Sequence, residues 1–233
     1  MHQNEYLITK NNLLYVKGSS HRVSIPNLNK KLALFLGLLW GDGWLLNRNI
    51  AKTNGNWRIG LVEDDLPLIN NFALLVEDLF RIKPKLCDRI TKIEVYFNSR
   101  IVYDFLNLKF NFPDGEKIGK LRVPKQILFS KRCTLAFLSG LFSTDGSFTL
   151  YKGYPRIQFD SATFEFVKEV ESILTDLDFN PRFYTYNRSN GNKLYGIHLN
   201  GVKQVCLFNK LIGFIGEKAN KLANFILACS PVV

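Results

Sequence analysis

The sequence predicts an α+β fold made of two similar halves, because two unrelated sequence markers each occur twice. The apolar run FLGLLWGDG, which contains Asp42, returns as LSGLFSTDG, which contains Asp145, at an offset of 103 residues (145 minus 42). The segment GEKIGKL at Gly115 returns as GEKANKL at Gly216, at an offset of 101 residues (216 minus 115). Nearly equal offsets of two unrelated markers indicate an internal duplication.

Each half shows the same order of predicted elements: helix, two strands, helix, two strands, helix. In the first half these elements cover residues 35–41, 44–52, 57–64, 65–80, 83–100 (two strands) and 101–108, with a hairpin turn at Asn54-Gly55. In the second half they cover residues 138–144, 146–162 (two strands), 164–177, 181–201 (two strands, turn at Asn190-Gly191) and 203–211. We therefore expect two pseudo-symmetric αββαββα halves, residues 1–121 and 122–233, each with an antiparallel sheet.

Small residues recur along one stripe of each apolar helix. Gly37 and Gly41 in the first helix correspond to Gly140 and Thr144 in the second. Small residues at i, i+4 spacing allow two helix backbones to approach closely. If the two helices pack side by side about a pseudo-twofold axis, their C-terminal ends coincide, and the two aspartates at those ends converge.

Two converging carboxylates repel each other unless a cation neutralises them. Mg²⁺ favours one or two carboxylates together with waters and phosphate oxygens of a substrate, and it can activate water for phosphodiester cleavage. An isolated Asp-Gly pair would indicate only a turn. The duplicated apolar helix that ends in the same acid instead favours a site for Mg²⁺ or another divalent cation such as Mn²⁺.

The composition favours a folded protein with a polyanionic partner. The chain is 46% hydrophobic, which is ample for a core, and 31 Lys+Arg against 20 Asp+Glu give a formal net charge of +11. No segment reaches the ~18 uninterrupted apolar residues of a membrane span, and the amino end lacks the apolar core of a signal peptide. We therefore expect a soluble, intracellular protein with a polyanionic partner.

Cysteine and histidine chemistry is not expected. The four cysteines and three histidines are scattered, without the spacing of a zinc site, a disulfide framework or a histidine-based nucleophile. Any hydrolytic chemistry must then rest on carboxylates.

The two motifs FLGLLWGDG and LSGLFSTDG resemble those of single-chain LAGLIDADG homing endonucleases, and the resemblance in the order of parts spans nearly the whole chain. It implies a saddle of two antiparallel sheets over DNA, with the motif helices at the interface between the halves. It also implies that Asp42 and Asp145 bind Mg²⁺ with the main-chain oxygens of Gly41 and Thr144. The expected molecule is a monomer that cuts both strands of a long, asymmetric double-stranded DNA site.

Members of this family usually have a polar residue at the end of the second strand and a basic residue after the fourth. Counting along this chain places Glu63 in the first polar position and Asp160 or Ser161 in the second. The basic candidates are Arg100 and Lys203. The alternatives are structural: Glu63 as an acid that leads the next helix, and the two basic residues as solvated surface charges.

DNA contacts are expected from one face of each sheet, because alternate residues of a strand point the same way. In the major groove Arg reads guanine and Gln reads adenine, whereas Lys more often meets phosphate. Each residue alone is equally consistent with an ordinary solvent-facing position. The candidates are Arg48, Lys52, Arg58, Lys85, Arg89, Arg156, Gln158, Arg182, Tyr184, Arg188 and Lys193.

Four other functions fit part of the pattern. An RNA-binding intron maturase or a non-catalytic DNA-binding regulator on the same fold also needs a basic surface, but retention of both acids favours cleavage. An intein is not expected, because the chain begins MHQNE and ends ACSPVV, without a nucleophile at the start or an asparagine at the end. A glycosidase also uses paired carboxylates, but nothing else in the sequence points to a sugar.

Overall fold

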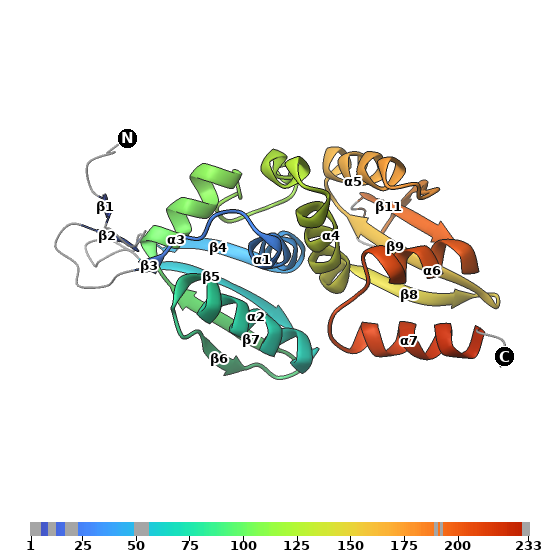
Figure 1. Ribbon diagram of the computed structural model, residues 1–233, viewed down its shortest axis with the longest axis horizontal. Helices are drawn as coiled ribbons and strands as arrows, with labels where there is room; N and C mark the ends of the chain where they lie inside the picture. The colour runs from blue at the N-terminus through green and yellow to red at the C-terminus, as the bar shows by residue number, and fades with distance from the viewer. Residues whose placement is uncertain are drawn as a thin grey trace.

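Two halves with the same order of elements lie side by side, joined at their centre by the helices α1 (Lys30–Gly41) and α4 (Lys131–Asp145) (Figure 1). The computed structural model describes residues 6–8, 13–16, 23–48, 56–188, 191 and 193–229. The predicted α+β class and the αββαββα order of each half are confirmed.

In the N-terminal half, α1 is followed by β4 (Gly43–Arg48), β5 (Asn56–Glu63), α2 (Leu66–Phe80), β6 (Lys85–Asp88), β7 (Ile93–Asn98) and α3 (Arg100–Asp104), which continues into the π-helical turn η1 (Phe105–Lys109). In the C-terminal half, α4 is followed by β8 (Gly146–Tyr151), β9 (Tyr154–Ser161), α5 (Phe164–Asp176), β10 (Arg182–Asn187), β11 (Lys193–Asn200) and α6 (Val202–Leu211). The strand orders β4-β5-β7-β6 and β8-β9-β11-β10 are equivalent, and every pairing is antiparallel.

Side chains placed by the sequence start the helices of the N-terminal half. Asn29 accepts a hydrogen bond from the Leu32 amide at the start of α1, and Asp65 accepts one from the Leu68 amide at the start of α2. Such caps satisfy amide groups that have no partner inside the helix. They set the point at which each strand turns into the next helix.

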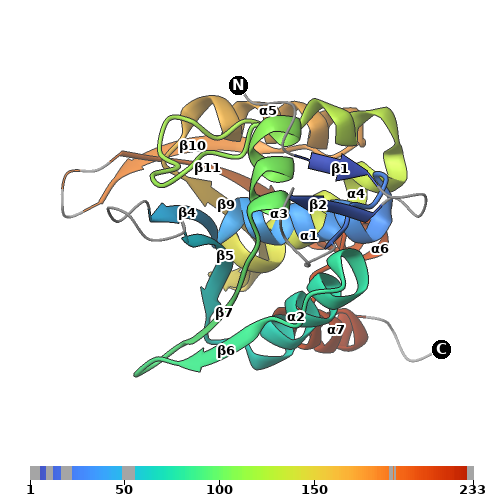
Figure 2. The same cartoon turned by 90° about the vertical axis from the view of Figure 1, so that its left-hand side faces the viewer.

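Helices cover one face of each sheet, and the strands lie on the other side of the molecule (Figure 2). The helix α2 packs on β5 and β7, while α5 and α6 pack on β9 and β11. Ile59 and Phe159 point into these helix layers and are fully buried. We call the opposite side of each sheet its open face; it carries the alternate positions, such as Arg58 and Gln158.

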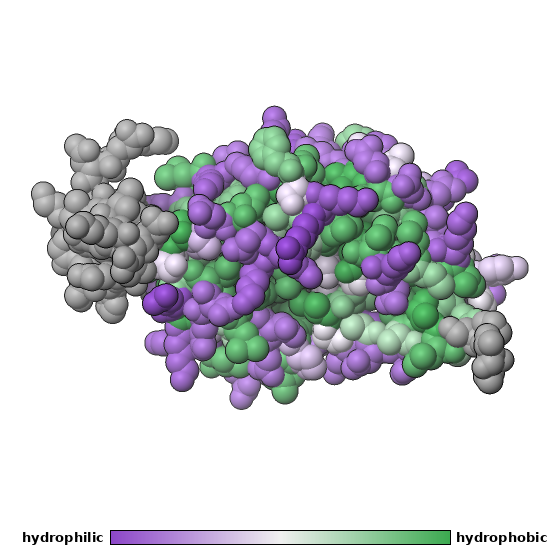
Figure 3. Space-filling view, viewed as in Figure 1, coloured by the Kyte–Doolittle hydropathy of each residue, from purple (hydrophilic) through white to green (hydrophobic). Residues whose placement is uncertain are grey.

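The helix-covered side has hydrophilic side chains spread among hydrophobic ones over its whole surface (Figure 3). No helix in the described part of the chain has both the length and the apolar character needed to cross a membrane.

Three features were not predicted. A small sheet of β1 (Tyr6–Ile8), β2 (Leu13–Val16) and β3 (Val23–Ser24) precedes α1, and a short helix, η2 (Lys125–Phe129), precedes α4. The second copy of the GEK marker opens a further helix, α7 (Glu217–Cys229). The first copy lies in the linker between the halves, which we define as residues 110–124. The predicted boundary after residue 121 lies in this linker and stays a prediction. The turn at Asn54-Gly55, together with Asn190, lies outside the described residues.

Candidate active site

The backbones of α1 and α4 touch at the small residues of the motif. A Cβ atom added to Gly37 would lie 2.0 Å from the Phe137 carbonyl oxygen, and one added to Gly140 would lie 2.4 Å from the Leu34 carbonyl oxygen. Real Cβ atoms essentially never approach so closely. Glycine is therefore required at both positions, as the predicted small-residue stripe implies.

This packing brings the two aspartates together at the ends of the helices. Asp42 is the C-terminal cap of α1, and Asp145 is the last residue of α4. A Cβ atom on Gly41 would lie 3.4 Å from the Asp145 carboxyl carbon and closer still to Thr144. Both acids line one cleft of about 580 Å³, so the convergence expected from the duplication is found.

The cleft concentrates negative charge. Burial, followed by the charge of Asp42, raises the pKa of Asp145 to about 7. Glu63, at the end of β5, is 8% exposed and hydrogen-bonds to Asp42. Burial and this hydrogen bond raise the pKa of Glu63 to about 8. Carboxyl groups that hold protons near neutral pH mark a site where a cation would be stabilising.

Two lysines that the sequence reasoning did not select are the basic groups of the cleft. The Lys117 ammonium group donates to the carbonyl oxygens of Trp40, at 3.2 Å, and Gly41. The Lys218 ammonium group donates to those of Ser143, at 2.7 Å, and Thr144, at 2.6 Å. Burial lowers the pKa of both lysines, and the surrounding acids oppose that shift.

The two lysines occupy the same position in the duplicated marker: each is the first lysine of its copy, GEKIGKL or GEKANKL. The sequence reasoning used that marker only to establish the duplication. A repeated lysine at nearly the same distance after each repeated aspartate was the signal that could have identified them.

The donors in the cleft fit a divalent cation. The carbonyl oxygens of Gly41 and Thr144, which were expected to bind metal, each hold a positively charged ammonium group. Two carboxylates and two carbonyl oxygens are the oxygen donors that Mg²⁺ prefers. No group of three or more His, Cys, Asp or Glu side chains with metal-binding geometry occurs among the described residues, so a cation here would depend on these carbonyls, water and substrate oxygens.

Comparison with known proteins agrees with this arrangement. Residues 132–213 match the LAGLIDADG-like domain family. The homing endonuclease I-DmoI, solved in complex with DNA and Mn, superposes with a TM-score of 0.61 at 20% identity, over 80% of this chain and 97% of that one. Residues 132–213 therefore form a LAGLIDADG-like domain, and the whole chain has the fold of this endonuclease.

Longer curated proteins also contain a segment similar to this chain. A DNA polymerase from Thermococcus hydrothermalis is 28% identical over 93% of this chain, and a probable translation initiation factor from Thermococcus kodakarensis is 26% identical over 88% of it. The matches cover 13% and 17% of those two proteins, so this chain spans only a small part of their length.

Strand register decides which polar residues are equivalent in the two halves. Gly43 pairs with Leu61, and Gly146 pairs with Phe159, so Glu63 corresponds to Ser161, and Val62 to Asp160. Ser161 and Asp160 both line the cleft. The helix-leading role considered for Glu63 belongs to Asp65.

Arg100 and Lys203 are not brought to the LAGLIDADG acids. Arg100 begins α3, where it lies over the Trp57 ring at 5.1 Å and pairs with Asp104 at 3.8 Å. Lys203 is exposed in the first turn of α6. The polypeptide returns to the cleft only after the helix that follows the fourth strand, so Lys117 and Lys218 replace these two residues as the basic candidates.

Most of the predicted DNA contacts within the described residues lie on the open faces. Arg58 stacks over Tyr96 at 3.8 Å, Arg156 donates to Asn200 at 2.7 Å, and Arg188 lines the cleft beside the acids. Lys85, Gln158, Arg182 and Tyr184 have the same orientation by register. The neighbour of the strand with Arg182 is β11, which lies between it and β9.

Four further DNA candidates remain. Lys193 shares the helix-covered face with Ile197, because it alternates with the open-face residues of β11, so its placement with the others was wrong. Arg89 follows β6 and pairs with Glu94. Arg48, the last residue of β4, pairs with Asn56 and therefore has the open-face register of Arg58, and Lys52 lies outside the described residues.

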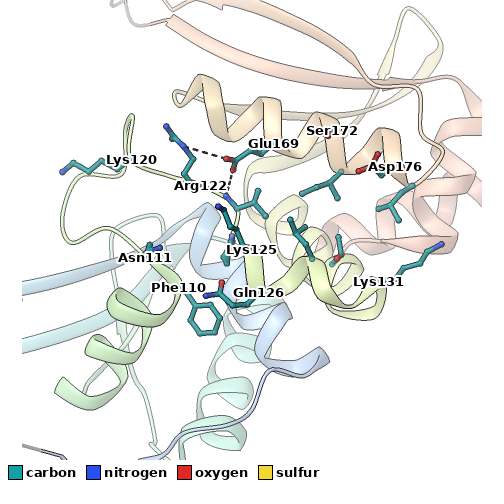
Figure 4. Close-up of a pocket in the computed structure, with 16 residues that line it drawn as sticks. Phe110, Asn111, Lys120, Arg122, Lys125, Gln126, Lys131, Glu169, Ser172 and Asp176 are labelled. Atoms are coloured by element: carbon teal, nitrogen blue, oxygen red, sulfur yellow. Dashed lines mark hydrogen bonds and ion pairs between the residues drawn. The ribbon is translucent and has the colours of Figure 1, made fainter. Parts of the chain in front are cut away.

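A larger cavity of about 950 Å³ lies between the linker and α5 (Figure 4). Glu169 of α5 holds the linker at this cavity. Its carboxylate accepts a 2.6 Å hydrogen bond from the Val123 amide and lies 3.9 Å from the Arg122 guanidinium group. Neither LAGLIDADG aspartate lines this cavity, so its size does not make it the candidate active site.

Proposed function

We propose that this protein is a metal-dependent, site-specific DNA endonuclease that makes double-strand breaks at a long, asymmetric site. The observation that carries the proposal is the convergence of Asp42 and Asp145 at the ends of two duplicated helices, in a cleft that also contains Lys117 and Lys218. A regulator or a purely RNA-binding protein would have no need for a half-buried acidic pair, which costs stability unless it is neutralised.

Each residue of the cleft has a role that its chemistry permits. Asp42, Asp145 and the carbonyl oxygens of Gly41 and Thr144 would hold a divalent cation. When bound, such a cation neutralises the acids and activates water for attack on a phosphodiester. The lysine ammonium groups would stabilise the negative charge that develops on the scissile phosphates.

The two halves of the cleft differ in one polar position. Glu63 holds a proton near neutral pH beside Asp42, whereas Ser161 supplies a hydroxyl group beside Asp145. The two strands should therefore be cut at unequal rates, so that a nicked intermediate appears before linear DNA. Direct passage of supercoiled plasmid to linear product would contradict this assignment.

The curated relatives support a portable module. Similar segments occur within a DNA polymerase and within a probable translation initiation factor, whose named activities have nothing in common. Such a segment does not account for either activity. A separate nuclease carried by a mobile element, such as an intron, fits this distribution, and a single chain with internal pseudo-twofold symmetry fits an asymmetric target.

The test is cleavage of a plasmid with Mg²⁺ added or withheld. The plasmid carries the gene in which the reading frame of this protein is inserted, in its uninterrupted form. Wild-type protein should linearise it only with the cation. Asp42→Asn and Asp145→Asn remove charge with little change in volume, so both should abolish linearisation and retain binding in a mobility-shift assay with Ca²⁺. Cleavage by both variants at the wild-type rate would refute the proposal.

A further inference from the structure

The open face of the C-terminal sheet carries a connected polar cluster that extends from the cleft to the middle of the sheet. Asp160 accepts hydrogen bonds from the Tyr184 hydroxyl and, at 2.7 Å, from Nε2 of Gln158. The Oε1 atom of Gln158 faces Nε2 of His198 at 3.2 Å. The rings of Tyr184 and His198 are stacked with centroids 3.9 Å apart. We call these four residues the reading cluster.

A glycine makes this cluster possible. Tyr184 is on β10 and Asp160 on β9, with β11 between them. The tyrosine side chain crosses β11 above Gly196, where an added Cβ atom would lie 2.2 Å from the Asp160 carboxylate and 2.5 Å from the Tyr184 hydroxyl. In the N-terminal half the position of Asp160 is taken by Val62, so the cluster belongs to one half only.

The hydrogen bonds of the reading cluster determine the tautomer of His198. An ionised carboxylate has only acceptors, so the nitrogen of the Gln158 amide must face Asp160, and its oxygen must face His198. Nε2 of His198 must then carry a proton. In a neutral imidazole the other nitrogen, Nδ1, is left with a lone pair and acts as an acceptor.

The imidazole is neutral at ordinary pH. Burial, followed by the positive charge of Arg156, lowers the pKa of His198 to about 4, and the charge of Asp160 opposes this shift only in part. Among the described residues, Nδ1 of His198 has no hydrogen-bond partner. The cluster therefore presents one unsatisfied acceptor on the open face.

We propose that His198 is a specificity residue that selects adenine or cytosine at one position of the DNA site. In the major groove these two bases present an exocyclic amino group, which is a donor, whereas guanine and thymine present only acceptors and a methyl group. A lone acceptor therefore pairs with adenine or cytosine and rejects the other two. Gln158, with both amide atoms engaged, does not read adenine directly as expected above.

This inference rests on the proposed DNA-binding function, and one binding selection separates the two. Protein would be incubated with a randomised duplex library and Ca²⁺, which avoids dependence on cleavage, and the bound DNA would be sequenced. Wild-type protein should show a position with a preference of about five- to tenfold for adenine or cytosine, the discrimination that one hydrogen bond supplies. His198→Phe, which keeps an aromatic ring against Tyr184, should lose the preference at that position alone.

A second variant tests the tautomer itself while leaving His198 in place. In Asp160→Asn the Tyr184 hydroxyl would hold the amide oxygen, so that the new amide nitrogen faces Gln158. The Gln158 amide would then turn over, present its nitrogen to Nε2 of His198, and move the ring proton to Nδ1. The preference at the same position should change to guanine or thymine. Thr185→Ala, on the other face of β10, is the control and should leave every preference unchanged.

The outcomes distinguish the two claims. If wild-type protein enriches no sequence, site-specific DNA recognition is refuted, and this inference falls with it. If sequences are enriched but His198→Phe has the wild-type profile, or Asp160→Asn keeps adenine or cytosine at the position, only the role of His198 is refuted. Thermal unfolding of each variant would verify that it is folded.

Discussion

Replacing Gly140 with alanine should destabilise the protein, because the added methyl group has no room between α1 and α4. Its carbon would lie 2.4 Å from the Leu34 carbonyl oxygen and 2.7 Å from the Leu38 amide nitrogen. Both are backbone atoms, which cannot rotate away as a side chain could. Ordinary contacts begin at 3.4 Å, so the two helices must part locally by about 1 Å (3.4 minus 2.4).

The expected cost follows from this displacement. Overpacking a well-packed core costs about 1–3 kcal/mol, and a gap of up to ~1 Å removes roughly a quarter to a half of the dispersion energy of each atom pair. Alanine recovers about 1 kcal/mol of helix propensity relative to glycine. Because both clashing atoms belong to the backbone, the cost of overpacking should lie at the upper end of that range, and subtracting the gain in helix propensity leaves a net loss of about 1–2 kcal/mol in the free energy of unfolding.

Urea denaturation followed by circular dichroism would measure this loss. Ser139→Ala, on the same helix, is the matched control and should change the free energy of unfolding by no more than about 0.5 kcal/mol. Cleavage by Gly140→Ala should also slow, because parting the helices moves Asp145 away from Asp42. A Gly140→Ala protein as stable as the wild type would refute the close contact of the two helix backbones.

Three further predictions concern the cleft and the open face. Lys117→Met and Lys218→Met should each lower the cleavage rate by about 100-fold or more and let nicked DNA accumulate, because each removes an ammonium group beside the acids. Lys203→Ala is the control and should cleave at the wild-type rate. If Lys203→Ala slowed cleavage and the two methionine variants did not, Lys203 would be the basic residue of the site, as first expected from the sequence. Without metal, the raised pKa values of Asp145 and Glu63 should lower the unfolding temperature as the pH rises from about 4 to about 7, because the folded state binds their extra protons across that window, whereas the lowered pKa of His198 acts in the opposite direction. The wild type should therefore lose more stability over this window than Asp145→Asn, and an equal pH dependence of the two proteins would contradict the raised pKa of Asp145. Arg182→Ala should reduce the slope of log affinity against log salt by about one unit if the arginine meets phosphate, and an unchanged slope and base preference would place the contact surface elsewhere.

The parts of the cleft that could be predicted from the sequence are those marked by features that occur twice within short segments. Two apolar helices that end in the same acid, with glycine at matched positions, are sufficient to predict that the helices pack together and that Asp42 converges with Asp145. Small residues at matched positions indicate a close contact, because larger side chains would hold the two backbones apart. The order of strands and helices follows from hydrophobic periodicity in the same way.

The basic residues of the cleft could not be predicted from their spacing in the sequence. Counting from the fourth strand selected Arg100 and Lys203, but the chain turns away from the cleft through a helix before it returns with Lys117 and Lys218. The length and path of that return depend on packing of the linker against α1 and α4. Sequence spacing does not encode this path, although the repeated GEK marker contains both lysines at matched positions.

The sequence by itself determined that this protein has two equivalent halves, which helices join them, and which acids meet at their ends, because duplication and periodicity are properties of the chain alone. Only the tertiary structure decided that Glu63 is matched by Ser161, that Lys193 faces the helices, and that Gln158 is engaged by its neighbours. These outcomes depend on strand register and on side chains that meet across strands. A shift of one residue in register would move every side chain to the other face, and no pattern within a single strand records its partner's register.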